Sequence, residues 1–161
     1  MKNICIILLC LVGAISSQEK QSSSAWQTYT SRGLFDHRSG LTIYSVSATK
    51  NIRDNSEFFA SAGTIGFINS VASGVRFNKE RSGTYYDRTY LVTSARIMAF
   101  SHRELTLENL RFVPTIGIGL EKDLSERSAI NIGIFSGLGY YNDERGVSIY
   151  TMPMISYITR W

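Results

Sequence analysis

The sequence predicts an all-β chain that folds as an eight-stranded antiparallel up-and-down transmembrane β-barrel. Three observations predict this class. Apolar and polar residues alternate with period two over most of the chain, no segment has a convincing helical period, and the alternating segments number eight. With 161 residues, of which 43% are hydrophobic, the chain is long enough for one domain and too short for two ordinary ones.

The N-terminal segment precedes the first strand and has the composition of an export signal. A short basic start is followed by an apolar run over residues 4–15 and then by small residues up to Ser17. The run is shorter than the about 20 residues that a spanning helix needs. We therefore predict a cleavable signal peptide over residues 1–17 and a mature domain over residues 18–161, with an N-terminal anchor helix as the alternative. Both cysteines, Cys5 and Cys10, fall within the signal.

The mature domain begins with a polar, Ser-rich lead and continues as strands. The fourth expected strand is separated from the third by a short turn at residues 68–70, although residues 56–78 could instead form one bent strand. An even count places both termini of the chain on the same side of the membrane, as bacterial single-chain barrels require. The predicted strands are residues 26–34, 41–50, 56–67, 71–78, 84–98, 106–121, 128–141 and 147–161.

The sixth and seventh predicted strands show most clearly which strand face points to the lumen and which points to lipid. One face of each is bulky and apolar, and the other face consists mostly of small or polar residues. The lumen of an eight-stranded barrel is only just wide enough for side chains, so we expect the small face inside and the bulky face against lipid. The residues expected to face lipid include Phe112, Ile116, Ile118, Leu120, Ile130, Ile132 and Ile134.

Ionisable residues occur on the opposite face of several strands. A charge in hydrocarbon costs several kcal/mol, so we expect these groups to point into the lumen and to pair there. A polar network of this kind would plug a narrow barrel, whereas a selective pore is the alternative. The predicted network comprises Arg76, Arg88, Arg96, Glu121 and Arg160.

Two segments share the pattern K-[ND]-[IL]-x-[DE]-x-S, at residues 50–56 and 122–128. Each is followed by an alternating strand, and Asn, Asp and Ser side chains can close a tight turn by bonding their own backbone. We predict that both segments form turns at the same end of the barrel, which we assign to the periplasm.

The last predicted strand ends the chain on Trp161, with Tyr157 on the same face. This ending resembles the C-terminal signature of bacterial outer-membrane β-barrel proteins, and the mature domain as a whole resembles the small OmpA/OmpX-type barrels. The resemblance implies a bacterial outer-membrane location, contact with outer-membrane lipids and insertion by the barrel-assembly machinery. Proteins of this class include structural anchors, adhesins and a few lipid-modifying enzymes. Short predicted loops favour a structural or lipid-contacting role over adhesion.

Two histidines are the weak candidates for catalysis. His37 lies two residues before Ser39, and a His base beside a Ser nucleophile is the arrangement that acyl transfer needs. His102 lies in another expected outward loop. We nevertheless expect solvated loop residues and no catalytic group. A lipid A acyltransferase or deacylase, or a phospholipase, is the alternative function, and a soluble secreted β-barrel that binds a small apolar ligand is the second alternative.

The remaining side chains limit the possible partners. The formal net charge is +4, but the basic residues are scattered among acids, so we expect no nucleic acid partner. No metal-ligand spacing or cofactor motif is present in the sequence, and none is predicted. Guanidinium groups pair well with phosphates, and we therefore hypothesise contact with lipopolysaccharide headgroups through Arg32, Arg38, Arg103 and Arg145.

Overall fold

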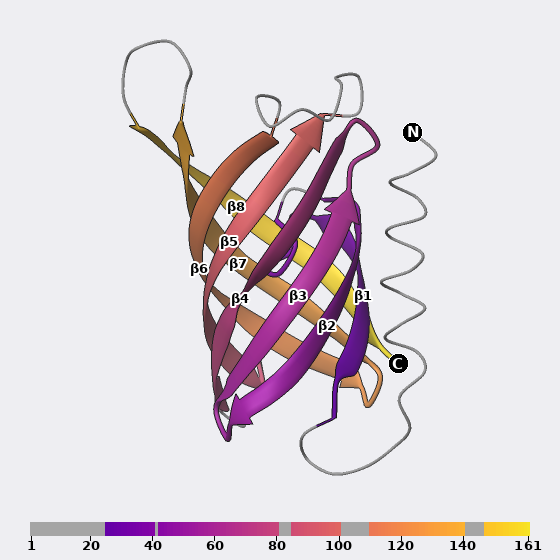
Figure 1. Cartoon of the computed structure of the whole chain (residues 1–161). Helices are drawn as coiled ribbons and strands as arrows, with labels where there is room; N and C mark the ends of the chain where they lie inside the picture. Colours follow the sequence, from indigo (N-terminus) through magenta and orange to yellow (C-terminus); the bar gives the residue numbers. More distant parts are fainter. Residues whose placement is uncertain (1–24, 41, 81–84, 101–109, 141–146) are drawn as a thin grey trace.

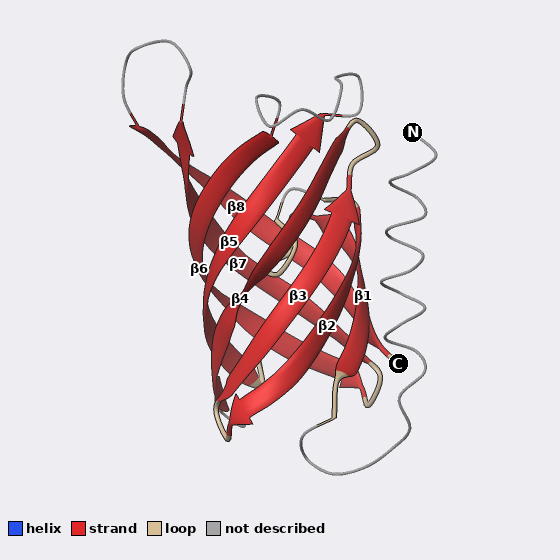
Figure 2. Ribbon diagram, viewed as in Figure 1, coloured by secondary structure: helices blue, strands red, loops and turns tan. Residues whose placement is uncertain are grey.

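The computed structural model describes residues 25–40, 42–80, 85–100, 110–140 and 147–161, and these form eight strands (Figure 1). The predicted signal peptide lies outside the described residues. The strands follow one another in chain order as tilted ribbons around a single lumen (Figure 2). Their bounds are β1 Gln27–Leu34, β2 Tyr44–Arg53, β3 Ser56–Thr64, β4 Ile68–Glu80, β5 Arg88–Phe100, β6 Leu110–Ser125, β7 Ser128–Tyr140 and β8 Val147–Arg160.

The barrel is closed by pairing between the first and last strands. Each strand pairs antiparallel with the next, and β1 pairs with β8 from Tyr29 opposite Arg160 to Leu34 opposite Ile155. Closure leaves no unpaired sheet edge, so every strand has a hydrogen-bonded neighbour on both sides. The prediction of an all-β, eight-stranded antiparallel up-and-down barrel is therefore confirmed.

The third and fourth strands are separate, as predicted, but the turn between them lies a few residues earlier. Residues 65–67 connect them, and the backbone N–H of Ile65 donates to the carbonyl of Ile68 at 3.0 Å. Gly66 adopts a φ of +93°, a left-handed conformation that glycine reaches without strain. The reversal therefore takes place at this glycine, and β4 begins three residues sooner than the pattern indicated.

The two copies of the repeated pattern both form tight hairpin turns. One connects β2 with β3 and the other connects β6 with β7, and each has a register shift just before it, between Asn51 and Arg53 and between Asp123 and Ser125. Both turns lie at the barrel end that also carries the start of β1 and the end of β8 (Figure 1). We call this end the terminal end of the barrel.

Side chains alternate between the two faces of the wall as their period of two requires. The large branched and aromatic residues of β6 and β7 point away from the lumen: Phe112, Ile116, Ile118, Leu120, Ile132 and Ile134 are 42–58% exposed, and Ile130 is half-exposed. Their neighbours in sequence, such as Gly117 between Val92 and Phe135, point inward. Among the described residues, no helix is long and apolar enough to cross a membrane.

The connection between β1 and β2 turns back into the lumen instead of extending outward (Figure 1). We call residues 35–40 the inner loop. Its base is closed by two backbone hydrogen bonds between Asp36 and Gly40, at 2.9 and 2.6 Å. Phe35 and Gly40 both have positive φ, of 60° and 79°, which lets the chain reverse within six residues.

Candidate functional site

The inner loop fills the middle of the barrel. Its four central residues, Asp36, His37, Arg38 and Ser39, are each at most 3% exposed. The predictions that His37 is solvated and that Arg38 lies on the outer rim against lipopolysaccharide are therefore wrong. The wall beside the loop carries small inward side chains, which leave the volume that the loop occupies: Ser45, Ser47, Ser61, Ser70 and Ala72.

Asp36 holds the loop in its tight conformation. Its carboxylate accepts hydrogen bonds from the backbone N–H and the hydroxyl of Ser39, at 3.3 and 3.0 Å, and from the hydroxyl of Ser45 at 3.3 Å. Burial opposes ionisation, but the neighbouring His37 and Arg38 outweigh it and hold the pKa of Asp36 well below its usual value. Asp36 is therefore a carboxylate that ties the loop to itself and to β2.

Both ring nitrogens of His37 are occupied. Nδ1 lies 3.2 Å from the Asp36 carboxylate and 2.9 Å from the Asn131 amide, and Nε2 lies 3.1 Å from a guanidinium nitrogen of Arg76. A guanidinium only donates, so Nε2 accepts; a carboxylate only accepts, so the ring proton lies on Nδ1 and faces Asp36, not the Asn131 amide nitrogen. Burial, reinforced by the charge of Arg38, lowers the pKa of His37 to about 4, so the ring is neutral at pH 7.

The Ser–His pair that catalysis would need does not form. The Ser39 hydroxyl lies within hydrogen-bond distance of Asp36 and of the Thr42 hydroxyl, at 3.0 and 2.9 Å, and His37 points to Arg76 instead. His102 lies outside the described residues. In the described part of the chain, Ser39 and His37 are therefore held by separate hydrogen bonds.

One ion pair connects the inner loop to the wall, and Arg76 beside it pairs with carboxylates of two other strands. Arg38 donates to Glu57 at 2.8 Å, and Arg76 donates to Glu121 at 2.7 Å while lying 3.7 Å from Glu57. The guanidinium of Arg76 also stacks on the Tyr90 ring at 4.3 Å, and the His37 ring lies 4.6 Å from the same tyrosine. The loop therefore contacts β3, β4 and β5 directly, and Arg76 extends the network to β6.

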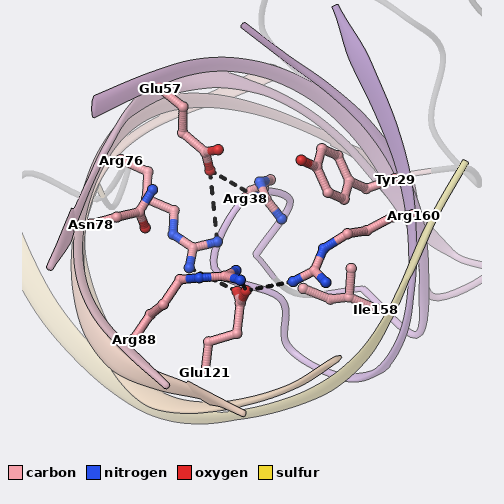
Figure 3. Close-up of a pocket in the computed structure, with 9 residues that line it drawn as sticks. All are labelled: Tyr29, Arg38, Glu57, Arg76, Asn78, Arg88, Glu121, Ile158 and Arg160. Carbon is pink, nitrogen blue, oxygen red and sulfur yellow. Dashed lines mark hydrogen bonds and ion pairs between the residues drawn. The ribbon is translucent and has the colours of Figure 1, made fainter. Parts of the chain in front are cut away.

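The charged network continues toward the terminal end. Glu121 also accepts from Arg88 and from Arg160, the latter at 2.9 Å (Figure 3). Asp123 binds the same two arginines. Glu121 thus contacts three guanidinium groups. A buried carboxylate is stable only with such compensation. Through these pairs Glu121 links its own strand, β6, to three others, β4, β5 and β8.

Arg96 lies on the other side of the inner loop and differs from the other predicted network residues. It donates to the Thr115 hydroxyl at 3.1 Å and to the His37 carbonyl at 3.2 Å, and it lies 5.4 Å from the Phe135 ring. None of the ion pairs found among the described residues includes it. A Cβ at Gly40 would lie 1.5 Å from an Arg96 nitrogen. Only a residue without a side chain therefore leaves room for Arg96 against the loop.

The structure thus places all five predicted network residues in the lumen and adds others that the pattern did not name. Asp123 shares the strand parity of Glu121, so period two alone could have found it. Arg38 and Asp36 have no such signal, because they lie on a connection whose direction period two does not specify.

A cavity of about 40 Å³ remains open at the terminal end of the network. It has room for a few water molecules. Figure 3 shows the lining side chains converging on this space from the strands and from the inner loop. They are Tyr29, Arg38, Glu57, Arg76, Asn78, Arg88, Glu121, Ile158 and Arg160.

The predicted assembly-signal residues lie at the seam of the barrel. Tyr157 is on the outer face of β8, opposite Arg32 of β1. The indole N–H of Trp161 donates to Thr30 at 3.2 Å and its backbone N–H donates to Thr28 at 3.0 Å. The last residue therefore fastens the closing pair of strands.

Comparison of the chain with protein-family models, with curated proteins and with solved structures finds no match. The strand number, antiparallel order and closure are consistent with the OmpA/OmpX-type fold. Across the described ranges, no three His, Cys, Asp or Glu side chains gather as metal ligands. Function therefore has to follow from the two faces of the wall and from the filled lumen.

Proposed function

We propose that this protein is a bacterial outer-membrane β-barrel with a sealed lumen and a structural or lipid-contacting role at the cell surface. The observation that carries the proposal is the inverted distribution of side chains. Charged and hydroxyl-bearing residues fill the inside, while branched apolar residues cover the outside of the long strands.

The apolar residues of the outer face form a continuous band across β5 to β8. In the strand register, Ile118 lies opposite both Leu91 and Ile134, and Ile132 lies opposite Ile155. Each such side chain gains about 1.5–3 kcal/mol when it leaves water, and soluble monomers rarely expose a large contiguous patch of this kind. A hydrocarbon solvent accounts for the band without any partner protein.

Aromatic residues flank the band at both ends, where amphipathic rings favour a membrane–water boundary. At the terminal end, the Trp26 and Phe58 rings pack edge to face with centroids 6.0 Å apart. Phe77, Tyr157 and Trp161 are exposed near the same end, and Tyr44, Phe67 and Phe112 are exposed near the opposite end.

The filled lumen supports a sealed barrel over a selective pore. The inner loop is buried across the middle of the barrel, its Arg38 pairs with Glu57 of the wall, and its His37 accepts a hydrogen bond from Arg76. Breaking such pairs to admit a stream of ions would leave buried charges without compensation, which costs several kcal/mol.

The alternatives have less support. A lipid-modifying enzyme would need a nucleophile and base in contact, and Ser39 and His37 make other bonds. A soluble barrel for an apolar ligand would need an apolar interior, whereas this lumen holds arginines and carboxylates.

In this proposal the barrel is surrounded by outer-membrane lipids. The barrel-assembly machinery inserts it and recognises the final strand with Tyr157 and Trp161. Because Arg38 is buried, the proposed lipopolysaccharide contacts are the exposed Arg32 together with Arg103 and Arg145. The last two lie outside the described residues.

Cell fractionation combined with a heat-modifiable gel shift tests the proposal. We expect the full chain, expressed in a Gram-negative host, to sediment with outer membranes, to resist a urea wash and to migrate differently before and after boiling. Recovery in the soluble periplasmic fraction without detergent would refute the membrane assignment and favour the soluble barrel.

A further inference from the structure

We propose that the cavity at the terminal end of the lumen is a binding site for one small tetrahedral oxyanion, with inorganic phosphate as its simplest representative. The cavity is lined from six of the strands and from the inner loop, so its shape depends on the closed barrel and not on any one turn. Its lining is dominated by charged and polar groups, with Ile158 as the apolar member (Figure 3).

The charges around the cavity do not balance. Four arginines line it, Arg38, Arg76, Arg88 and Arg160, against two glutamates, Glu57 and Glu121. Asp123 binds Arg88 and Arg160 from beside the cavity and supplies a third carboxylate. Asp36 does not line the cavity: it accepts hydrogen bonds from Ser39 and Ser45, and its carboxylate lies 3.2 Å from the neutral His37 ring. Among the groups that line the cavity or bind its arginines, one guanidinium charge is therefore in excess, and an anion would neutralise it.

The arginines also keep donors that the carboxylates do not use. Each guanidinium has five N–H groups. Arg38 and Arg76 each bury an Nε for which the described residues supply no hydrogen-bond partner. The bonds of Arg38 to glutamate and of Arg76 to histidine and glutamate use terminal nitrogens. A bound oxyanion would supply acceptors to guanidinium groups that are already held in place, so little side-chain entropy would be lost on binding.

The size and chemistry of the space select the class of ligand. About 40 Å³ admits a few water-sized atoms, which suits four tetrahedral oxygens and excludes a nucleotide or a sugar. Guanidinium groups recognise such oxygens through paired N–H donors, and a cation would be repelled by the excess positive charge. The strength of the site comes from arginines on four separate segments, the inner loop, β4, β5 and β8.

The site does not depend on which solvent surrounds the barrel. It lies inside the wall, so the fractionation experiment and the binding experiment can fail separately. A barrel that proves soluble could still bind phosphate, and a membrane barrel could still have an empty, hydrated cavity.

Binding of inorganic phosphate to the full-length mature barrel, refolded in a zwitterionic detergent at pH 7, tests the inference. We expect one saturable site by calorimetry, together with an unfolding temperature that rises with sodium phosphate above its value in sodium chloride of equal ionic strength. Binding favours the folded state by mass action, so the rise should follow the calorimetric occupancy.

Three variants distinguish binding of phosphate in the cavity from a general effect of the protein's net charge. Arg160→Gln removes the excess charge while Arg88 still binds Glu121 and Asp123, and it should weaken phosphate binding roughly ten- to hundredfold. Glu57→Gln should have the opposite effect and tighten binding, because it raises the positive excess. The matched control is Arg127→Gln, which removes the same charge from the exposed turn at the same end and should change affinity less than about twofold.

The inference is overturned if phosphate and chloride stabilise the barrel equally at matched ionic strength, since a cavity filled only by water would behave in that way. Equal loss of binding in Arg160→Gln and Arg127→Gln also overturns it. If Arg160→Gln does not give the heat-modifiable folded form, the tightening expected for Glu57→Gln decides the question, and unchanged affinity in that variant refutes the site.

Discussion

A pair of matched isoleucine substitutions tests the depth of the barrel in a bilayer. Ile118 lies at the middle of β6, and Ile52 lies at the end of β2, beside the turn at the terminal end. Both side chains point outward and are almost equally exposed, at 58% and 55%. Replacing each with arginine therefore makes the same chemical change at the same solvent exposure but at different heights on the wall.

The expected magnitudes follow from those heights. An outward arginine costs about 2–4 kcal/mol at the bilayer midplane and about 0–1 kcal/mol near an interface. Ile118→Arg should therefore lower the free energy of unfolding by roughly 3 kcal/mol, and Ile52→Arg by less than about 1 kcal/mol. On a soluble barrel both positions would be surface sites, where substitutions change stability by about 0.5 kcal/mol or less.

Equilibrium unfolding in guanidinium chloride, with the barrel inserted in phosphatidylcholine vesicles, measures the difference. Trp26 and Trp161 report the transition by fluorescence, and both lie at the terminal end, away from Ile118. Equal effects of the two substitutions, or a negligible effect of Ile118→Arg, would show that the outer face does not meet hydrocarbon.

Three further predictions concern the lumen. Glu121→Gln should destabilise the barrel by about 3 kcal/mol, because three guanidinium groups lose their carboxylate partner. In a double-mutant cycle with Arg76→Gln, the double variant should lose less stability than the sum of the two single variants. Additive losses would contradict the network. His37 has a folded pKa of about 4 against 6.5 in the unfolded chain, so the unfolded state binds the proton first and stability should fall by about 3 kcal/mol as the pH decreases from 6.5 to 4. That fall should be absent in His37→Gln, and an unchanged pH profile in the variant would refute the assignment. Replacing the inner loop, residues 35–40, with a Gly/Ser linker of equal length should turn a non-conducting barrel into an anion-selective channel in planar bilayers. The expected selectivity follows because arginines outnumber acids in the remaining lumen. A variant that stays non-conducting would show that the strands alone seal the lumen.

The strand pattern could be predicted because each strand obeys a local rule. Alternation places Ile116 and Ile118 on one face and Gly117 on the other whatever the neighbouring strand contains. The same parity found Arg76, Glu121 and Arg160, and it could have found Asp123. The turn at Gly66 was misplaced by a few residues, because a glycine and a run of apolar residues do not fix where a chain reverses.

The inner loop is the part that local rules could not reach. Residues 35–40 contain Asp, His, Arg and Ser, which is the composition of a solvated loop, and they were predicted to be one. Their burial depends on small side chains of β2, β3 and β4, such as Ser45, Ser61 and Ser70, which become neighbours of the loop only after the barrel closes. Polar composition does not exclude burial when the enclosing wall supplies hydrogen-bond partners.

The sequence by itself determined the class of this protein: an alternating, eight-strand chain with one apolar and one polar face on its long strands, ending on an aromatic residue. Only the tertiary structure decided what occupies the centre, where the loop meets Glu57, Arg76, Arg96 and Asn131 from four different strands. The physical reason is that strand parity is set by bonds between adjacent residues. The contacts of the inner loop and the cavity depend instead on distances across a closed lumen, such as that between His37 and Asn131, which are 94 positions apart.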